Sequence, residues 1–302
     1  MAWAKDIWRP AIVEAPIEQI IRLGSLEGMA VHWLPAMGSL QFLADPFGLW
    51  HDGALHVFVE RYDYRDRLGT IEVLGFDADF RLLDRRIALT EPWHLSYPFV
   101  FEAEGEIWML PESVRAGRLR LYRSIGFPAR WEVAGFVEID GNPVDATPFH
   151  HDGLWWLLYS GDDPGAPSGR ALCLAYAERL TGRWWRHPAS PVSIDRASAW
   201  PGGRPISHGN AIIVPLQDSS ATYGGGIRLM TIDQLSPDRF AATVGARIAA
   251  PGAFAPFVEG LHTLAAAGPV TLIDVKRIDR SLHSAWSDIS RALRRRRAPH
   301  PG

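Results

Sequence analysis

The chain has 302 residues, of which 47% are hydrophobic, 11% aromatic and 22% charged. This is the composition of an ordinary globular protein with enough apolar material for a large core. The formal net charge of −3 gives no electrostatic support for binding to nucleic acid, so we expect no nucleic-acid partner.

The N-terminal stretch, residues 1–16, carries charges at Lys5, Asp6 and Arg9 and has no long apolar run, so we expect no secretory signal. No segment of the sequence approaches the roughly 18 apolar residues of a membrane span. The single cysteine, Cys173, excludes an internal disulfide and favours a reducing compartment. We therefore expect a cytoplasmic protein.

A phrase of strand-forming residues recurs three times along the chain. The copies occupy residues 43–60, 96–112 and 144–160. Each copy holds an apolar run, a turn that ends in glycine, and a second apolar and aromatic run, which is the pattern of a β-hairpin. The turn glycines Gly53, Gly105 and Gly153 stand 52 and 48 residues apart. A spacing near 50 residues is typical of propeller blades, each of which is a four-stranded antiparallel sheet.

Other segments complete the units in chain order. Outer strands are predicted over residues 68–77, 117–124 and 170–178, a fourth unit over 209–232, and the start of a fifth over 257–277. Residues 28–35 could supply the strand that closes the ring. We therefore predict an all-β fold, a single five-bladed β-propeller over residues 1–278, with blades that start near 43, 96, 144, 205 and 254. Two β-sandwiches are the alternative architecture, but they do not explain the repeated phrase.

The last segment, residues 279–302, has a different pattern. Leu282, Trp286, Ile289 and Leu293 fall at helical spacing, which predicts a C-terminal amphipathic helix that ends in four consecutive arginines. This helix either packs on the propeller with a solvated basic end or attaches to an anionic membrane surface. The second reading would place the protein at the periphery of the inner membrane.

The repeat also aligns polar residues that would surround the propeller axis. Asp45, Tyr97 and Asp145 each stand eight residues before the turn glycine, and Glu60, Glu112 and Ser160 each stand seven after it. Carboxylate pairs carry out glycosidic bond cleavage, in which one carboxyl protonates the leaving oxygen and the other activates water or attacks the anomeric carbon. Each acid could instead be structural, since Asp45 precedes a proline and Glu60 and Glu112 could pair with arginines.

These patterns assign candidate roles to nine residues. Catalysis is assigned to Asp45, Glu112 and Asp145, and substrate binding to Glu60, His94, Tyr97, His208, Asp218 and His262. The histidines show no metal-ligand spacing and the glycine-rich segments lack the spacing of a phosphate-binding loop, so we predict no metal and no cofactor. The 13 tryptophans fit either core packing or the stacking of sugar rings.

Several short segments occur in the order found in a known family. They include FLADPF at 42–47, HLSYPFVF at 94–101 and VDATPF at 144–149. On these motifs, residues 30–277 resemble the five-bladed propeller domain of the glucosamine inositolphosphorylceramide transferase N-terminal type. Such domains occur in plant sphingolipid glycosyltransferases and in bacterial proteins associated with surface-polysaccharide synthesis.

The chain is also similar, more distantly, to the furanosidase-like propellers of arabinanases, xylosidases and fructosidases. This second resemblance implies that Asp45 is a general base or nucleophile. It implies an orienting aspartate on the second blade, where this chain has Tyr97. It further implies an acid on the third blade, for which Asp145 is the nearest equivalent and Glu60 and Glu112 are alternatives.

Two functions follow from this reading. The first is an enzyme that cleaves or transfers a glycosyl unit of a surface polysaccharide or glycolipid precursor. The second is a non-catalytic propeller that binds such a glycan and positions it for a partner glycosyltransferase. The clustered acids favour the first, and the separate transferase domain of the plant proteins favours the second. A pair of funnel carboxylates roughly 5 to 9.5 Å apart would favour catalysis, whereas acids paired with arginines would favour binding or a purely structural role.

Overall fold

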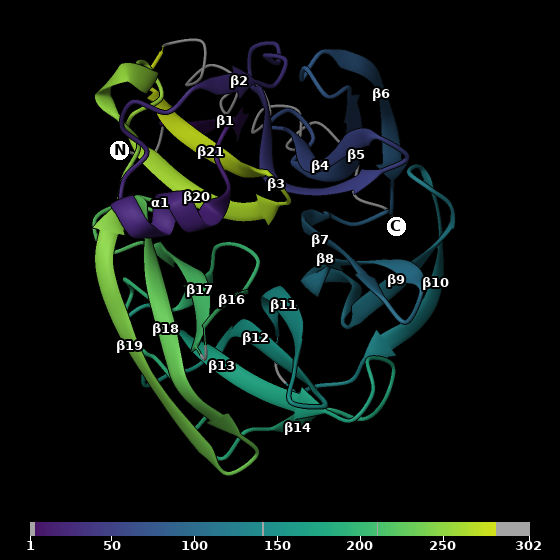
Figure 1. Ribbon diagram of the computed structural model, residues 1–302, viewed down its shortest axis with the longest axis vertical. Helices are drawn as coiled ribbons and strands as arrows, with labels where there is room; N and C mark the ends of the chain where they lie inside the picture. The colour runs from purple at the N-terminus through teal and green to yellow at the C-terminus, as the bar shows by residue number, and fades with distance from the viewer. Residues whose placement is uncertain (1–3, 141, 210, 282–302) are drawn as a thin grey trace, which may run out of the picture.

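The computed structural model describes residues 4–140, 142–209 and 211–281. Within these residues the chain forms five antiparallel sheets around a central axis, which is a five-bladed β-propeller (Figure 1). The all-β fold and the five blades predicted from the repeat are therefore confirmed. The predicted C-terminal helix rests on Leu282 and later residues, which lie outside the described part of the chain.

The first three blades follow the repeated phrase and run outward from the axis in chain order. The first consists of β3 (Gln41–His51), β4 (Ala54–Asp63), β5 (Leu68–Phe76) and β6 (Leu82–Leu89). The second consists of β7 (Ser96–Ala103), β8 (Glu106–Glu112), β9 (Leu119–Gly126) and β10 (Arg130–Val137). The third consists of β11 (Val144–His151), β12 (Leu154–Asp162), β13 (Arg170–Ala177) and β14 (Trp185–Arg186).

The fourth blade has a shortened inner edge. Its strands are β15 (Trp200–Pro201), β16 (Ile206–His208), β17 (Ala211–Asp218), β18 (Gly226–Ser236) and β19 (Arg239–Ile248). Both β15 and β16 pair with β17, so the inner strand is split in two. In the described part of the chain, three short helices lie outside the sheets: α1 (Ile17–Leu23), η1 (Val114–Ala116) and η2 (Gly252–Phe254). Among the described residues, no helix is long and apolar enough to cross a bilayer.

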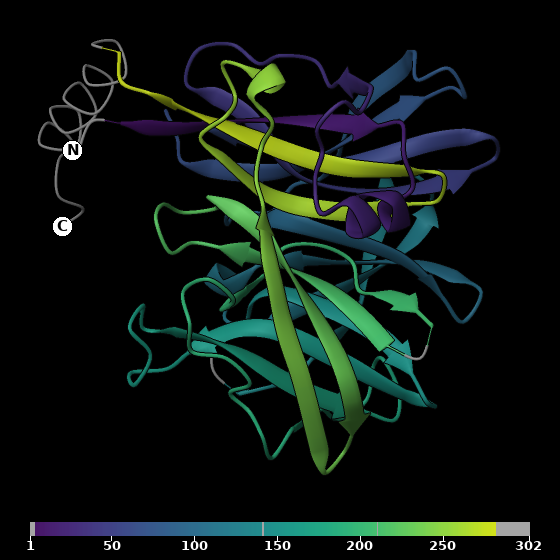
Figure 2. The ribbon, with the colours of Figure 1, turned by 60° about the vertical axis from the view of Figure 1, so that its left-hand side comes forward.

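The fifth blade joins the two ends of the chain. It consists of β20 (Gly260–Ala267), β21 (Val270–Asp279), β1 (Lys5–Val13) and β2 (Val31–Trp33). The purple β1 lies beside the yellow β21 in both ribbon views (Figures 1 and 2), and it pairs with β21 along its whole length. The ring therefore closes through two N-terminal strands, of which β1 was not foreseen. Its charged residues and Pro10 hide the strand pattern in the sequence.

The packing of β1 makes it part of the core. Ile12 on β1 is fully buried in the same apolar cluster as Phe47 on β3 and Leu272 on β21. The indole of Trp50 on β3 also donates a hydrogen bond of 3.0 Å to the carbonyl of Ala267 on β20. The junction between the first and last blades is thus held by buried apolar side chains and by a directed hydrogen bond.

Shortening a buried side chain of β1 tests this closure. We expect Ile12→Ala to lower the free energy of unfolding by about 2–4 kcal/mol, because it leaves a cavity where the first and last blades meet. Leu83→Ala on the outermost strand β6 is the control, since Leu83 is 61% exposed, and it should cost less than about 0.5 kcal/mol. Urea unfolding measures both, and equal effects would show that β1 does not hold the ring closed.

Candidate functional site

A cavity of about 410 Å³ lies at the end of the propeller axis where the repeated phrases begin; we call it the funnel cavity. Its acidic and imidazole lining consists of Asp6, Asp45, Glu60, Glu112, Asp145, His94 and His262. Its aromatic lining consists of Trp8, Phe42, Tyr62, Tyr64, Trp200 and Tyr223. Of the described residues that line it, none is lysine or arginine.

A larger cavity, of about 800 Å³, lies between the second and third blades. Its two acids, Glu138 and Asp140, are exposed to solvent. By contrast, four acids of the funnel cavity, Asp45, Glu60, Glu112 and Asp145, are each only 6–7% exposed. Because burial perturbs the proton affinity of a carboxyl group, the funnel cavity is the better candidate for chemistry.

β-Bulges aim the repeated residues at the axis. The pairing of each innermost strand with its neighbour is interrupted between Ala44 and Phe47 on β3 and at the same place on β7 and β11. Asp45, Tyr97 and Asp145 occupy these bulges with φ values of 51°, 45° and 53°. A bulge bends the strand and redirects one side chain, so the repeat places two carboxylates at the axis by the same local geometry.

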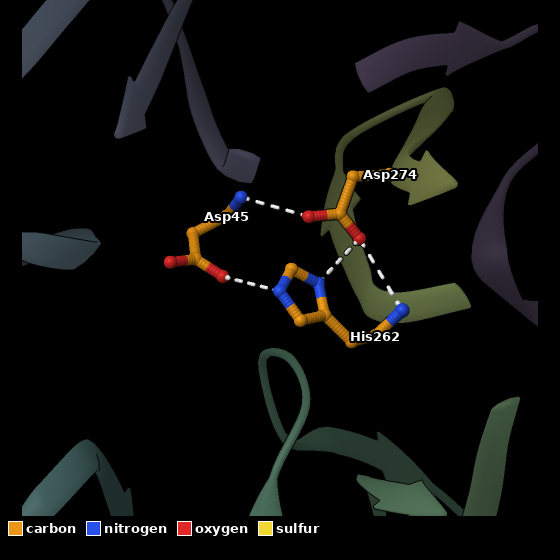
Figure 3. Close-up of side chains that lie close together, drawn as sticks. All are labelled: Asp45, His262 and Asp274. Carbon is orange, nitrogen blue, oxygen red and sulfur yellow. Dashed lines mark hydrogen bonds and ion pairs between the residues drawn. The ribbon is translucent and has the colours of Figure 1, made fainter. Parts of the chain in front are cut away.

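Asp45 is held by a buried group of side chains from the first and last blades (Figure 3). Its Oδ2 accepts a hydrogen bond of 3.0 Å from the backbone N–H of Tyr97, and its Oδ1 lies 3.5 Å from Nε2 of His262. Nδ1 of His262 lies 2.7 Å from Oδ1 of Asp274, whose other oxygen accepts from the backbone N–H of Asp45 at 2.8 Å. Asp45, His262 and Asp274 therefore form a closed chain of contacts.

The imidazole of His262 is covered by aromatic rings. Trp8 stacks on it with a centroid distance of 3.6 Å and an interplanar angle of 11°, and Tyr223 contacts it edge-on at 5.6 Å. Nζ of the fully buried Lys276 holds the loop that carries Tyr223, by donating to the carbonyl of Tyr223 and, at 3.2 Å, to Oγ1 of Thr222. The half-exposed Tyr223 is thereby fixed at the wall of the cavity.

The other acids have neutral partners. Oδ2 of Asp145 accepts from the side-chain amide of Gln217 at 3.1 Å, and the same nitrogen donates to the carbonyl of Pro201. Oε1 of Glu112 accepts from the backbone N–H of Val114 at 2.9 Å, whereas its Oε2 is buried without a hydrogen-bond partner.

Glu60 faces a histidine whose protonation is fixed by the backbone. Nε2 of His94 lies 3.5 Å from the Glu60 carboxylate, and Nδ1 of His94 accepts a hydrogen bond of 2.9 Å from the N–H of Gly69. Burial, with a smaller effect of Arg115, lowers the pKa of His94 to about 4. The ring is therefore neutral near pH 7 and presents an N–H to Glu60.

Burial and mutual repulsion raise the pKa values of all four funnel acids. Burial raises the pKa of Glu112 to about 7. Burial and the charge of Asp45 raise the pKa values of Glu60 and Asp145 well above the ordinary range. Burial also raises the pKa of Asp45, but nearby His262 opposes this rise. His262 and the Tyr97 N–H thus favour the ionised form of Asp45, whereas Glu60, Glu112 and Asp145 hold their protons to higher pH than ordinary carboxyls do.

His262 shows the opposite balance. Burial alone would lower its pKa, but the carboxylates of Asp274 and Asp45 outweigh burial and raise it. An imidazolium at this position would stabilise the ionised form of Asp45.

The same three residues are the group in the described part of the chain that could hold a metal ion. Asp45, His262 and Asp274 offer ligand atoms that all lie within 4.8 Å of one another. Both nitrogens of the imidazole face a carboxylate, and both oxygens of Asp274 accept hydrogen bonds. A divalent ion would have to replace these contacts, so the geometry fits a hydrogen-bonded chain better than a metal centre.

Six of the nine residues predicted for the site meet in the funnel cavity: Asp45, Glu60, His94, Glu112, Asp145 and His262. The other three do not line it. The ring of Tyr97 packs into the core, and its hydroxyl shares a hydrogen bond of 2.9 Å with the hydroxyl of Thr147. Asp218 is paired with Arg228 at 2.9 Å, and His208 is exposed at the far end of β17 from Asp218. Substrate contact by these three side chains is therefore not supported.

Sequence reasoning missed several residues of the site. Asp6 and Trp8 lie on the unforeseen β1, and Asp274 and Gln217 lie on second strands of blades that the glycine alignment did not cover. One signal was present, because Asp274 stands six residues after the turn glycine Gly268, close to the spacing of Glu60 from Gly53.

The fold and the site define a five-bladed propeller with buried, arginine-free carboxyls at the end of its axis. The profile of the family described as "Glucosamine inositolphosphorylceramide transferase 1, N-terminal" matches residues 34–250. The chain therefore belongs to this family, as its motifs predicted.

Curated relatives agree with this assignment. The chain is 36% identical over 205 residues to glucosamine inositolphosphorylceramide transferase 1 of Oryza sativa subsp. indica and 34% identical to the protein of the same name in Arabidopsis thaliana. Each match covers 66% of this chain but only 27% and 26% of the two plant proteins. The chain thus spans about a quarter of the length of these relatives.

Several solved structures with the same fold are glycoside hydrolases. The catalytic domain of a GH62 α-L-arabinofuranosidase from Coprinopsis cinerea superposes with a TM-score of 0.57 and 14% identity, covering 80% of this chain and 93% of that one. An α-L-arabinofuranosidase from Podospora anserina gives a TM-score of 0.56 and 12% identity, covering 82% of this chain and 94% of that one. At these identities the likeness establishes the fold alone.

The pKa of Glu112 makes a prediction about stability. A carboxyl whose pKa rises from about 4.5 to about 7 on folding destabilises the folded state as the pH rises between these values, because only the unfolded chain ionises there. We therefore expect the unfolding free energy of Glu112→Gln, relative to the parent, to increase by about 2–3 kcal/mol from pH 4.5 to pH 8.

Urea unfolding at several pH values measures this difference. Glu106→Gln is the matched control, since Glu106 lies on the same strand β8 with an exposed side chain. A difference between Glu112→Gln and the parent that stays constant with pH would contradict the raised pKa.

Proposed function

We propose that the funnel cavity binds a glycan and that its carboxyls cleave or transfer a glycosyl unit. The observation that carries this proposal is that Asp45, Glu112 and Asp145 are buried around one cavity and, among the described residues, form no ion pair with arginine or lysine. Structural acids of this protein look different, since Glu72 and Asp218 are buried against arginines.

The environments of the acids separate their roles. Asp45 acts as general base or nucleophile, because the Tyr97 N–H and His262 fix and stabilise its carboxylate. Glu112 acts as general acid, because its pKa of about 7 lets it hold a proton at neutral pH and release it to a leaving oxygen. Asp145, oriented by Gln217, is the alternative acid.

The aromatic lining supports a sugar as the ligand. Trp200 and Tyr223 line the cavity with partly exposed rings. Flat aromatic faces give apolar contact to the C–H faces of sugar rings, while carboxyls bind their hydroxyl groups.

The comparisons support the same class of substrate. The family is named after glucosamine inositolphosphorylceramide transferase 1, and the structural neighbours are named as α-L-arabinofuranosidases. Glycan chemistry is the element that these names share.

A second candidate function is a non-catalytic glycan-binding propeller that positions substrate for a partner glycosyltransferase. The matching family is an N-terminal region, and the chain covers about a quarter of the plant transferases. In such an arrangement the catalytic groups of the transfer reaction would lie in a different part of the assembly.

Release of sugar from surface glycans of the source organism distinguishes the two functions. We expect Asp45→Asn and Glu112→Gln to lower the rate by about 10²–10⁴-fold, the usual contribution of a positioned acid or base. We also expect the parent's rate to fall as the pH rises above about 7, where Glu112 loses its proton.

The exposed acids provide controls, and Asp52→Asn and Glu106→Gln should leave the rate unchanged. Glycan binding by affinity electrophoresis is measured in parallel. If parent and variants all bind the glycan and none releases sugar, the binding function replaces the catalytic one.

A further inference from the structure

A third cavity, of about 380 Å³, adjoins the funnel cavity on the other side of Trp8, which lines both. It lies between strands β1 and β21 of the last blade and residues 35–41, which lead into the first blade. The charged side chains that line it are Arg9, Arg277 and Asp279. We call it the arginine pocket.

The two arginines are neighbours on paired strands. Arg277 on β21 pairs with Ile7, and Arg9 stands two residues further along β1, so both side chains emerge close together on one face. Both guanidinium groups lie over the ring of Phe257, at 5.9 Å for Arg9 and 5.8 Å for Arg277. Arg9 also lies over the ring of Trp33 at 5.0 Å.

No carboxylate in the described part of the chain forms an ion pair with Arg9 or Arg277, although the charge of Arg277 helps to lower the pKa of Asp279. Nε of Arg9 is buried without a hydrogen bond. Burial lowers the pKa of Arg9, which reflects the lost hydration of its charge. Asp279 lines the pocket, but its Oδ1 accepts from the N–H of Ser281 at 2.9 Å.

Two other arginines of the protein are held differently. Arg228 and Arg85 each form a hydrogen-bonded ion pair with a buried carboxylate, Asp218 and Glu72 respectively. Without such a partner the buried Nε of Arg9 has no acceptor, so an anion bound beside Arg9 and Arg277 would be stabilised by both guanidiniums.

We propose that Arg9 and Arg277 form a subsite for a phosphate group. The planar fork of a guanidinium donates parallel hydrogen bonds to phosphate oxygens, and two forks can hold one phosphate from two sides. The aromatic rings of Phe257 and Trp33 support the guanidiniums from behind. The phosphate could be a free sugar phosphate or the headgroup of a phospholipid, which share this chemistry.

The position of the pocket relates it to the funnel cavity. A ligand that carries a phosphate beside a sugar could place the sugar among the funnel acids and the phosphate at the arginines, on the two sides of Trp8. This connection rests on the glycan function proposed above, whereas the phosphate subsite itself does not.

Calorimetric titration at low ionic strength tests the subsite with three probes: inorganic phosphate, glucose 1-phosphate and vesicles of phosphatidylinositol in phosphatidylcholine. We expect Arg9→Gln and Arg277→Gln each to weaken phosphate binding by about tenfold or more, since each removes charged hydrogen bonds. Arg239→Gln, an exposed arginine of β19, is the control and should bind as the parent does.

Thermal unfolding with and without phosphate distinguishes a variant that has lost the phosphate site from a variant that is only less stable. Phosphate should raise the melting temperature of the parent and of Arg239→Gln but not that of the double variant Arg9→Gln/Arg277→Gln. Arg9→Lys keeps the charge but loses the fork, so it should retain weaker binding.

The outcomes separate the source of the phosphate from the existence of the site. Arginine-dependent binding of soluble phosphates supports a sugar phosphate, and arginine-dependent binding of vesicles alone supports a lipid headgroup. If phosphate binds but glucose 1-phosphate binds no more tightly, the subsite stands while its connection to the glycan function fails. Binding that the double variant retains in full, or no binding of any probe, overturns the proposal.

Discussion

The carboxylate of Asp274 is the contact on which both the ring and the site depend. It is fully buried and accepts hydrogen bonds from the backbone of Asp45 in the first blade and from the backbone of Thr263 and the ring of His262 in the last. A buried charge is tolerated only when such donors replace its hydration. The first and last blades supply those donors where they meet, so the contacts that close the ring also orient Asp45.

The three β-bulges share one backbone geometry, but their side chains have different roles. Asp45, Tyr97 and Asp145 all adopt positive φ, which costs a non-glycine residue about 1–2 kcal/mol. Two of the bulges present carboxylates to the cavity, but the third turns Tyr97 into the core against Phe47, with ring centroids 4.8 Å apart. The backbone of Tyr97 still serves the site by donating to Asp45. The second blade thus orients the catalytic candidate with an N–H where the furanosidase pattern implies an aspartate.

The repeat in the sequence was enough to predict the first three blades and the residues that they place at the axis. The turn glycines at 53, 105 and 153 marked three blades, and residues at a fixed distance from them converge because equivalent strands occupy equivalent places. The contacts that close the ring could not be found this way, since β1 pairs with β21 from the opposite end of the chain. Trp8 enters the site through that pairing.

The glycine alignment did not extend to the fourth blade for a local reason. Its inner edge is divided between β15 and β16, and its turn glycine, Gly209, stands 56 residues after Gly153 instead of 48 or 52. Without an aligned glycine, the sequence assigned substrate binding to His208 and Asp218, although they lie at opposite ends of β17 and Asp218 is paired with Arg228. Gln217, adjacent to Asp218 on the strand, is the residue that reaches Asp145.

The charges on the two sides of Trp8 constrain any ligand. The funnel cavity is lined by acids with raised pKa values. An anion placed among them would raise these pKa values further, and the electrostatic repulsion would be strong because the site is buried. The funnel therefore admits groups that are neutral or positively charged. On the opposite side of Trp8, Arg9 and Arg277 favour anions. Trp8 is fixed by stacking on His262, and His262 also faces Asp45. The position of His262 therefore determines both the orientation of Asp45 and the boundary between the two cavities. A ligand that spans this boundary would thus be oriented by its own charge distribution before any bond is broken.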